Sequence, residues 1–381
     1  MRHDYEVIIV GAGPAGATLA YELAKKGIRV LLLEKETLPR YKCCAGGVSV
    51  GAAKLLSVDI HELAEDVVSS ATISFKGDSP YLGRHDQALM YTVMRDRFDH
   101  ALVRRAEEAG AVLVQGQEVR QIQTNAKGIK VLTPAGDFRA LYVAGADGAH
   151  SAVARELRLK NNSSYLAAIE TEVLVPEEEL TRWRSQIAID LGCVPGGYAW
   201  VFPKLDHLSI GIACLSSKAK GLRQRYWEFL DSLNITHHSI TKWSGSLIPR
   251  CGRDVVASRG RVALLGDAAG LIDPLTGEGI YNAVWSAQLA APVIEESLQH
   301  GRIELENYQQ AIEEKIIPEI RIARVLSRLF VQFPSMVFNM LNREERVWRG
   351  CCYLLRREID YNTIIQRLGG FRSIYTLLSR I

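Results

Sequence analysis

A glycine-rich turn near the amino terminus constrains the fold of this chain more than any other feature. The apolar run at residues 6–10 predicts a buried parallel strand, which leads directly into Gly-Ala-Gly-Pro-Ala-Gly at residues 11–16. Residues 17–26 predict a helix that ends at a glycine, and a second apolar run at residues 29–33 ends at Glu34. This order of strand, glycine turn, helix and strand predicts a Rossmann-like α/β unit.

Each glycine of the turn has its own physical role. Gly11 permits the tight bend, Gly13 lets backbone N–H groups approach a pyrophosphate, and Gly16 allows the helix to pack closely on the strand. The helix N-terminus adds unpaired N–H donors and the positive end of its dipole. Glu34 can accept hydrogen bonds from ribose hydroxyls and would repel a 2′-phosphate. The unit is therefore predicted to bind a dinucleotide that lacks a 2′-phosphate.

Two later strands end in short turns that suit a cofactor spanning the whole domain. The strand at residues 139–148 ends in Asp-Gly, and the strand at residues 261–267 ends in Gly-Asp. A second glycine-rich helix start follows, where backbone N–H groups can face the edge of a flavin ring, and an aspartate can bind ribityl hydroxyls. The candidate residues of these turns are Asp147, Gly148, Gly266, Asp267, Gly277, Gly279 and Ile280.

These elements, in this order, resemble the FAD-dependent monooxygenase and reductase superfamily typified by p-hydroxybenzoate hydroxylase. The resemblance implies an α/β fold with a discontinuous Rossmann-like FAD-binding domain, an inserted substrate domain built on a mixed or antiparallel sheet, and a C-terminal helical region. The implied ranges are 1–60, 90–160 and 250–300 for FAD, 61–89 and 161–249 for substrate, and 301–381 for the helices. Further FAD contacts are implied at Ala15, Lys35, Arg95 (at a helix start) and Val119 (through its backbone).

Two segments resemble one branch of that superfamily, the geranylgeranyl reductase family. The first is the Cys-x-Gly-Gly element at Cys44, Ala45, Gly46 and Gly47, whose glycines would let the main chain lie against FAD. Cys44 would reach toward the isoalloxazine, where it could tune the flavin, deliver a proton to the substrate, or simply fill space. No role is assigned to the neighbouring Cys43.

The second segment places three aromatic residues on one face of a strand. Tyr198, Trp200 and Phe202 alternate with small or aliphatic residues and match the family's Tyr-x-Trp-x-Phe-Pro motif without a gap. Such a wall suits a long apolar substrate, because aromatic rings offer a large contact area with few rotamers to freeze. An ordinary sheet core would place aromatic residues in the same way. The strand at residues 208–213 is predicted to complete a hairpin.

Charge and composition exclude several other classes. The chain has 381 residues with 46 Lys and Arg against 43 Asp and Glu, too balanced for a dedicated nucleic-acid-binding protein. No window reaches the roughly 18 consecutive apolar residues of a membrane span, and the start lacks a signal-peptide layout. Seven scattered cysteines form neither a disulfide framework nor a zinc site. A cytoplasmic enzyme without a bound metal is expected.

The C-terminal stretch is unusually rich in arginine. Residues 320–381 hold 11 arginines, no lysine and 4 acidic residues, and apolar positions from Ile322 and Val325 to Phe333 recur at helical spacing. A basic amphipathic helix can contact an anionic membrane surface, which suits an enzyme with a lipid substrate. The same pattern also fits a helical cap that closes a substrate tunnel.

The family resemblance implies an FAD-dependent reductase that saturates isolated C=C bonds of a geranylgeranyl chain. The chain would be free as a diphosphate or attached to chlorophyll or a glycerophospholipid. Electrons would come from NADPH or from a donor protein such as reduced ferredoxin, since no second dinucleotide fingerprint is visible. The alternatives are a flavin-dependent aromatic monooxygenase or halogenase on the same scaffold, and a lipid-binding protein that keeps FAD without turnover.

Overall fold

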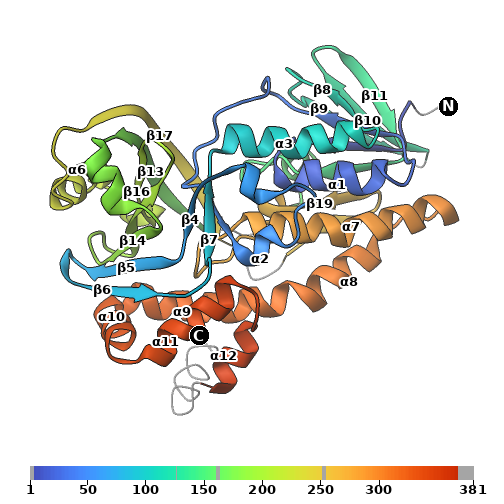
Figure 1. Ribbon diagram of the computed structural model, residues 1–381. Coiled ribbons are helices and arrows are strands. Elements are labelled where there is room, and N and C mark those ends of the chain that lie inside the picture. Colours follow the sequence, from blue (N-terminus) through green and yellow to red (C-terminus); the bar gives the residue numbers. More distant parts are fainter. Residues whose placement is uncertain (1–3, 126, 160–163, 251–254, 368–381) are drawn as a thin grey trace.

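The protein has the α/β architecture that the sequence predicts. The computed structural model describes residues 4–125, 127–159, 164–250 and 255–367. The end of the predicted C-terminal helical region, from residue 368 onward, lies outside the described residues. Two large sheets lie side by side, and a group of helices lies beneath them (Figure 1).

Short, fully buried apolar runs build a six-stranded sheet in one half of the molecule. The strands in spatial order are β18 (Ser258–Arg259), β19 (Val262–Leu264), β12 (Tyr142–Gly145), β1 (Val7–Val10), β2 (Val30–Leu33) and β8 (Val112–Val114). All neighbours pair in parallel except β18 and β19. Continuous apolar strands of this kind are expected where helices cover the sheet.

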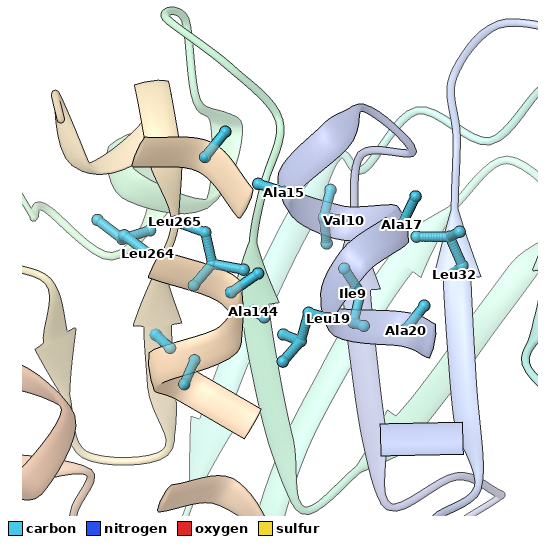
Figure 2. Close-up of a cluster of buried hydrophobic side chains, with 14 of the residues drawn as sticks. Ile9, Val10, Ala15, Ala17, Leu19, Ala20, Leu32, Ala144, Leu264 and Leu265 are labelled. Carbon is cyan, nitrogen blue, oxygen red and sulfur yellow. The ribbon is translucent and has the colours of Figure 1, made fainter. Parts of the chain in front are cut away.

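The helix after the glycine turn packs closely on this sheet. α1 (Pro14–Ala24) contacts β1 and packs against α3 (Arg95–Glu108) and α7 (Ile280–His300). Figure 2 shows Leu19 of α1 beside Ile9 of β1, with the small side chains of Ala17 and Ala20 on the same helix. All four side chains are fully buried, so the small residues allow a close approach of helix and strand.

The start of α1 differs from the prediction. The helix includes Pro14, Ala15 and Gly16, whereas the sequence pattern predicted a start at residue 17. Proline fits the first helical position, because its fixed φ suits a helix and its missing N–H would have no intrahelical partner there. The helix also ends two residues earlier than predicted, with Gly27 in the left-handed region (φ +78°) shortly after it.

The second large sheet is mixed and seven-stranded. Its strands in spatial order are β17 (Ser239–Arg250), β13 (Ser164–Leu174), β16 (Leu208–Leu215), β15 (Gly197–Pro203), β14 (Gln186–Leu191), β5 (Ser70–Phe75) and β6 (Asp78–Arg84). Only β5 and β14 pair in parallel. The predicted hairpin of β15 and β16 is present. One face of the sheet packs on α6 (Leu222–Ser232), and the other carries Trp200 and Phe202.

Smaller elements complete the fold around the two sheets. One small sheet holds β3 (Gly47–Ser49), β7 (Met90–Val93) and β4 (Ala64–Val68), and another holds β11 (Gly136–Ala140), β10 (Gly128–Thr133) and β9 (Gln121–Asn125). The short helices are α2 (Val50–Ala53), α4 (Ala152–Glu156) and α5 (Glu177–Trp183). The 3-10 turns are η1 (Ile60–Glu62), η2 (Ser216–Lys218) and η3 (Gly266–Ala269). Within the described ranges, none of the helices has the length and apolar character needed to cross a bilayer.

The C-terminal helices extend from the six-stranded sheet to the face of the seven-stranded sheet that carries Trp200 and Phe202. They are α8 (Glu306–Lys315), α9 (Ile317–Gln332), α10 (Pro334–Arg343), α11 (Glu345–Leu355) and α12 (Tyr361–Arg367). α10 packs on β5 and β14, and Phe338 and Trp348 join one buried cluster with Trp200 and Phe202. In Figure 1, α9, α10 and α11 lie beneath the edge formed by β5 and β6, and α8 lies beneath α7.

The apolar pattern of the arginine-rich stretch is correct in its first part only. Ile322 and Val325 of α9 are buried, as the helical spacing predicts. Phe333 is 49% exposed and lies between α9 and α10 rather than on the apolar face. The residue before a proline is disfavoured in a helix, so Pro334 ends α9 and starts α10.

Candidate functional site

The predicted phosphate turn lies at the carboxyl end of β1, and an added side chain would meet different surroundings at each of its glycines. A Cβ at Gly11 would lie 2.5 Å from the Ala146 carbonyl oxygen, and a Cβ at Gly16 only 1.9 Å from the Gly11 carbonyl oxygen. A Cβ at Gly13 would meet nothing closer than the Arg40 guanidinium at 4.0 Å. Gly11 and Gly16 are therefore required by the fold itself, whereas the space beside Gly13 is open.

The helix that follows this turn has an uncapped N-terminus. No side chain caps the first backbone N–H groups of α1, whose N-cap is Gly13. The first N–H groups of a helix have no intrahelical acceptor, and they favour a bound anion. The open space and the unoccupied donors together form a cradle for a phosphate group.

Glu34 lies at the edge of the same cradle. Its Oε2 accepts a hydrogen bond from the Ala12 N–H at 2.9 Å, and its Oε1 lies 3.6 Å from Arg40 Nε. The Gln117 N–H donates to the Glu34 carbonyl, so the segment that leads to Val119 runs beside it. The Val119 side chain is buried in the core, and the predicted contact of its backbone with adenine stays a prediction. Lys35 is exposed.

A buried ion cluster connects the phosphate turn to α3. Arg95 donates to both carboxylate oxygens of Asp99, at 2.8 and 2.9 Å, and Arg40 donates to the same carboxylate at 3.0 Å. Burial lowers the pKa of Arg95, but the Asp99 carboxylate and the Cys44 thiol beside it raise that pKa overall. Arg95, the predicted FAD contact, is thus fixed between the phosphate turn and the loop at residues 41–46, here called the Cys44 loop. The sequence prediction missed Arg40 and Asp99, and for Asp99 its i, i+4 relation to Arg95 was the available signal.

The Asp147 side chain is hydrogen-bonded to the start of the helix that follows it. It accepts hydrogen bonds from Ser151 Oγ and the Ala152 N–H, both at 2.6 Å, and so caps α4. An aspartate suits such a helix cap, and the predicted cofactor contact of Asp147 stays a prediction. Gly148, with φ +77° and open space around it, keeps a possible backbone contact as a prediction.

The second glycine-rich helix start presents a different carboxylate. Asp267 lies in η3, and its Oδ1 is 3.2 Å from where a Cβ of Gly279 would lie. Among the described residues no donor is hydrogen-bonded to the Asp267 carboxylate, and burial raises its pKa, while Lys42 and Arg95 lower it. α7 begins at Ile280 without a side-chain cap. Gly266 adopts φ +51° and packs against Ala283. This turn therefore offers a free acceptor and free N–H donors.

The Cys44 loop is held in place by a buried lysine. Lys204, at the end of β15, is fully buried, and its Nζ donates to the Ala45 carbonyl at 2.7 Å and to the Val93 carbonyl at 2.9 Å. Gly46 (φ +71°) has no room for a Cβ, which would lie 2.0 Å from the Val93 carbonyl oxygen. The sequence prediction missed Lys204. Its position directly after the Phe-Pro of the aromatic motif was the only signal.

The aromatic strand β15 contacts the turn at Gly277 and the chain at Gly47. The Tyr198 hydroxyl lies 2.9 Å from where a Cβ of Gly277 would lie, and the Phe202 ring 2.9 Å from that of Gly47. Burial, and after it the charges of Cys44 and Asp273, raise the pKa of Tyr198 to about 12. The rings of Tyr198 and Trp200 are 5.7 Å apart. The strand therefore reaches the position where the Cys44 loop and the start of α7 converge.

Trp200 continues the wall away from that point. Its ring lies over Gly211 of the neighbouring strand, where a Cβ would approach to 2.1 Å. Its indole Nε1 is buried and, within the described part of the chain, has no hydrogen-bond partner. Trp200 and Phe202 are 6% and 9% exposed, beneath α10 and α11. The wall is thus a covered apolar surface that begins at the glycine turns.

The C-terminal helices also contact the cofactor side of the site. The Tyr361 hydroxyl of α12 donates to Asp273 Oδ2 at 2.7 Å, directly before the Gly277 turn. The Arg357 guanidinium lies over the Tyr281 ring at 3.9 Å. Helices distant in the sequence therefore fix the loop that precedes α7.

Known proteins share these features. A family model described as FAD binding domain matches residues 4–195. An uncharacterized protein of Methanosarcina barkeri is 31% identical over 337 residues, which is 88% of this chain and 86% of the relative. A digeranylgeranylglycerophospholipid reductase of Methanocella arvoryzae is 30% identical over 316 residues, with 80% of each chain covered. This chain belongs to the geranylgeranyl reductase family.

A further relative and two solved structures are also similar to this chain. A chloroplastic geranylgeranyl diphosphate reductase of Arabidopsis thaliana is 27% identical over 357 residues, covering 85% of this chain and 74% of the relative. The crystal structure of a geranylgeranyl bacteriochlorophyll reductase-like protein of Thermoplasma acidophilum has a TM-score of 0.79 at 24% identity, with 86% of this chain and 88% of that chain covered. The halogenase PltM with phloroglucinol and FAD has a TM-score of 0.73 at 17% identity, covering 99% and 91%. These structural likenesses concern the fold alone.

As a geranylgeranyl reductase family member, the chain is an FAD-dependent oxidoreductase, and its site fits that cofactor. The open cradle at Gly13 suits the pyrophosphate, and Glu34 suits the adenosine ribose. The Asp267 carboxylate suits ribityl hydroxyls, and the N-terminus of α7 suits the polar edge of the flavin ring. The ring would then lie where Cys44 and Tyr198 converge.

Proposed function

We propose that this protein saturates isolated C=C bonds of a geranylgeranyl chain. The observation that carries the proposal is the position of Tyr198, which joins the Gly277 turn and the Cys44 loop to a covered apolar surface. A substrate bound along Trp200 and Phe202, between the seven-stranded sheet and α10, would present an alkene to the flavin side of this surface. Relatives named for geranylgeranyl diphosphate and for digeranylgeranylglycerophospholipid support this class of substrate.

The chemistry makes few demands on the protein. When bound, reduced FAD supplies a hydride (one proton and two electrons) to one alkene carbon and returns to its oxidised form. The other carbon takes one proton from the protein, so that C=C becomes CH–CH. An isolated alkene has no carbonyl oxygen to polarise, and catalysis therefore rests on positioning, exclusion of water and supply of the proton.

The site residues match these tasks. The buried aromatic wall positions an apolar chain and excludes water, since α10 and α11 cover it. Cys44 lies beside Tyr198 and Arg95, and we assign the departing proton to its thiol. Lys204 holds the backbone of this loop through Ala45 and Val93.

Three further parts of the proposal concern partners. The electrons come from NADPH or from a protein such as reduced ferredoxin. The head group of the substrate is a diphosphate, a glycerophospholipid or chlorophyll. The arginine-rich helices contact an anionic membrane surface, for which Arg346 and Arg349 of α11, with side chains 80% and 62% exposed, are available.

Product mass under anoxia tests the proposal. Reconstituted protein is reduced with dithionite, incubated anaerobically with geranylgeranyl diphosphate or a digeranylgeranyl glycerophospholipid, and the products are analysed by mass spectrometry. Each saturated bond adds two hydrogens, so the proposal predicts products heavier by that increment. A product formed only with oxygen would indicate a monooxygenase or halogenase. Binding without any product would indicate a lipid-binding protein that keeps FAD for structure.

A further inference from the structure

A row of ionisable side chains leads from the protein surface into the seven-stranded sheet. Asp206, with a side chain 76% exposed, lies 2.6 Å from His207 Nδ1 through its Oδ1. His207 Nε2 lies 3.1 Å from Glu172 Oε2, and Glu172 is only 6% exposed. His207 occupies the turn between β15 and β16, and Glu172 lies on β13. The outer half of the row thus joins solvent to a buried carboxylate.

The inner half of the row continues to the Cys44 loop. Glu170 is 1% exposed and lies two residues before Glu172, on the same face of β13. The Cys43 thiol donates to Glu170 Oε1 at 3.7 Å, and the Cys44 backbone N–H stabilises the Glu170 charge. The Tyr41 hydroxyl donates to Glu172 Oε1 at 3.1 Å. The same loop therefore contacts both carboxylates, and its next residue is the proposed proton donor.

Two carboxylates and few cations share this interior. Lys204 is the buried cation beside both glutamates, although its hydrogen bonds go to backbone carbonyls. Arg95 interacts with Cys44, and Lys242 of β17 lies over the Tyr41 ring at 4.9 Å. The titratable and charged groups that face Glu170 and Glu172 are therefore Tyr41, Cys43, Cys44, Arg95, Lys204, Asp206, His207 and Lys242.

The electrostatics keep an exchangeable proton on this row near neutral pH. Burial, and after it the neighbouring Glu172, raise the pKa of Glu170 to about 7. Burial lowers the pKa of His207, but its hydrogen bonds to Glu172 and Asp206 raise that pKa above the ordinary value overall. Groups that titrate near the working pH are suited to pass protons in both directions.

We propose that Asp206, His207, Glu172 and Glu170 form a proton path that recharges the Cys44 loop after each bond is reduced. This inference rests on the proposed function. One proton leaves Cys44 for the substrate carbon, and the thiolate takes a proton from Glu170, directly or through the Cys43 thiol. Glu170 regains its proton from Glu172 and His207, which take one from solvent at Asp206. The net transfer is one proton from water to carbon, balanced by the hydride from reduced flavin.

A purely structural role for these side chains would give different experimental results. Glu170 and Glu172 could simply offset the charge of Lys204 and help to fix the loop. In that case their neutralisation would change stability and loop geometry without removing a titration from the reaction. The pH profile of the reaction therefore separates the two roles.

The test compares Glu170→Gln and His207→Gln with the exposed control Glu178→Gln on α5. Reduction of geranylgeranyl diphosphate over many turnovers, with dithionite in excess so that Cys44 must be reprotonated after each reduced bond, is followed under anoxia across pH in the FAD-loaded chain. In the wild type the rate falls as pH rises through about 7, where Glu170 loses its proton. We expect Glu170→Gln to be slower by about 10- to 100-fold and to lack this limb, with the control unchanged. The double variant should be no slower than Glu170→Gln alone, because both residues act in one path.

A second readout needs neither cofactor nor substrate. Burial, and after it Glu170, raise the pKa of Cys43 to about 12, so loss of the Glu170 charge should lower that pKa. Alkylation of Cys43 in the FAD-free chain, resolved by peptide mass spectrometry, should then be several-fold faster at a fixed, mildly alkaline pH. His207→Gln, which lies nearer the surface, keeps the kinetic test available if Glu170→Gln folds poorly.

Distinct outcomes would overturn distinct parts of the account. A wild-type pH limb preserved in Glu170→Gln, rate losses that multiply in the double variant, or unchanged alkylation of Cys43 would each overturn the proton path alone. A wild-type chain that reduces no polyprenyl compound under anoxia would overturn the proposed function, and the path with it.

Discussion

A matched pair of glycine substitutions separates cofactor binding from folding. Gly13→Val and Gly16→Ala lie three residues apart in one turn, but a side chain meets different surroundings at the two positions. At Gly13 the nearest atom to a new Cβ is Arg40 NH2 at 4.0 Å, and the backbone (φ −80°, ψ −173°) suits a β-branched residue. At Gly16 the new Cβ would lie 1.9 Å from a backbone oxygen.

The expected magnitudes follow from these distances. Valine at position 13 should change the free energy of unfolding of the FAD-free chain by less than about 1 kcal/mol, because a small N-cap penalty opposes a less flexible unfolded chain. It would, however, block the phosphate from the α1 N–H groups. Two lost charge-assisted hydrogen bonds cost about 3 kcal/mol or more, which weakens FAD binding at least about 100-fold. Gly16→Ala should destabilise the FAD-free chain by about 3 kcal/mol or more through overpacking.

Chemical unfolding of the FAD-free chain and titration with FAD measure the two effects separately. The account requires Gly13→Val to retain wild-type stability and lose FAD, and Gly16→Ala to lose stability. Wild-type affinity for FAD in a folded Gly13→Val chain would refute the assignment of this turn to the pyrophosphate.

Three further predictions concern the flavin side, the substrate wall and the buried carboxylates. Asp267→Ala should weaken FAD binding about 10-fold, since it removes an acceptor for ribityl hydroxyls, and equal affinity by titration calorimetry would contradict that role. Trp200→Ala should slow turnover of geranylgeranyl substrates with the FAD content intact, and loss of FAD on purification would contradict the wall assignment. Because the folded-state pKa of Glu170 is raised to about 7 from 4.5, its contribution to stability is complete below about pH 4.5 and is lost as pH rises through 7. The difference in unfolding free energy between wild type and Glu170→Gln should therefore shrink over this range by up to about 3 kcal/mol, and a pH-independent difference would show that Glu170 does not titrate as described.

Local patterns predicted the parts of the site that are continuous in the sequence. The Gly11 to Gly16 turn with Glu34, and the alternation of Tyr198, Trp200 and Phe202, are fixed by strand and helix periodicity. The close approach of Tyr198 to Gly277 and of Phe202 to Gly47 was not predictable in detail, because it depends on how the two sheets pack.

Residues that act through tertiary contacts were missed. Lys204 and Glu170 come from different strands and meet the Cys44 loop only in the folded chain. The helix cap formed by Asp147 was also missed, because an aspartate after a strand suits a helix cap as well as a cofactor, and only the geometry around Ser151 shows the cap. Capping and buried charge compensation leave weaker sequence signals than glycine turns.

Reoxidation of the bound flavin tests the central claim most directly. The FAD-loaded protein is photoreduced without oxygen and mixed with geranylgeranyl diphosphate, and the absorbance of oxidised flavin is followed while product is quantified. The account predicts that this absorbance returns under anoxia, with one saturated bond formed for each flavin reoxidised. A flavin that stays reduced with every polyprenyl compound until oxygen is admitted would contradict the account.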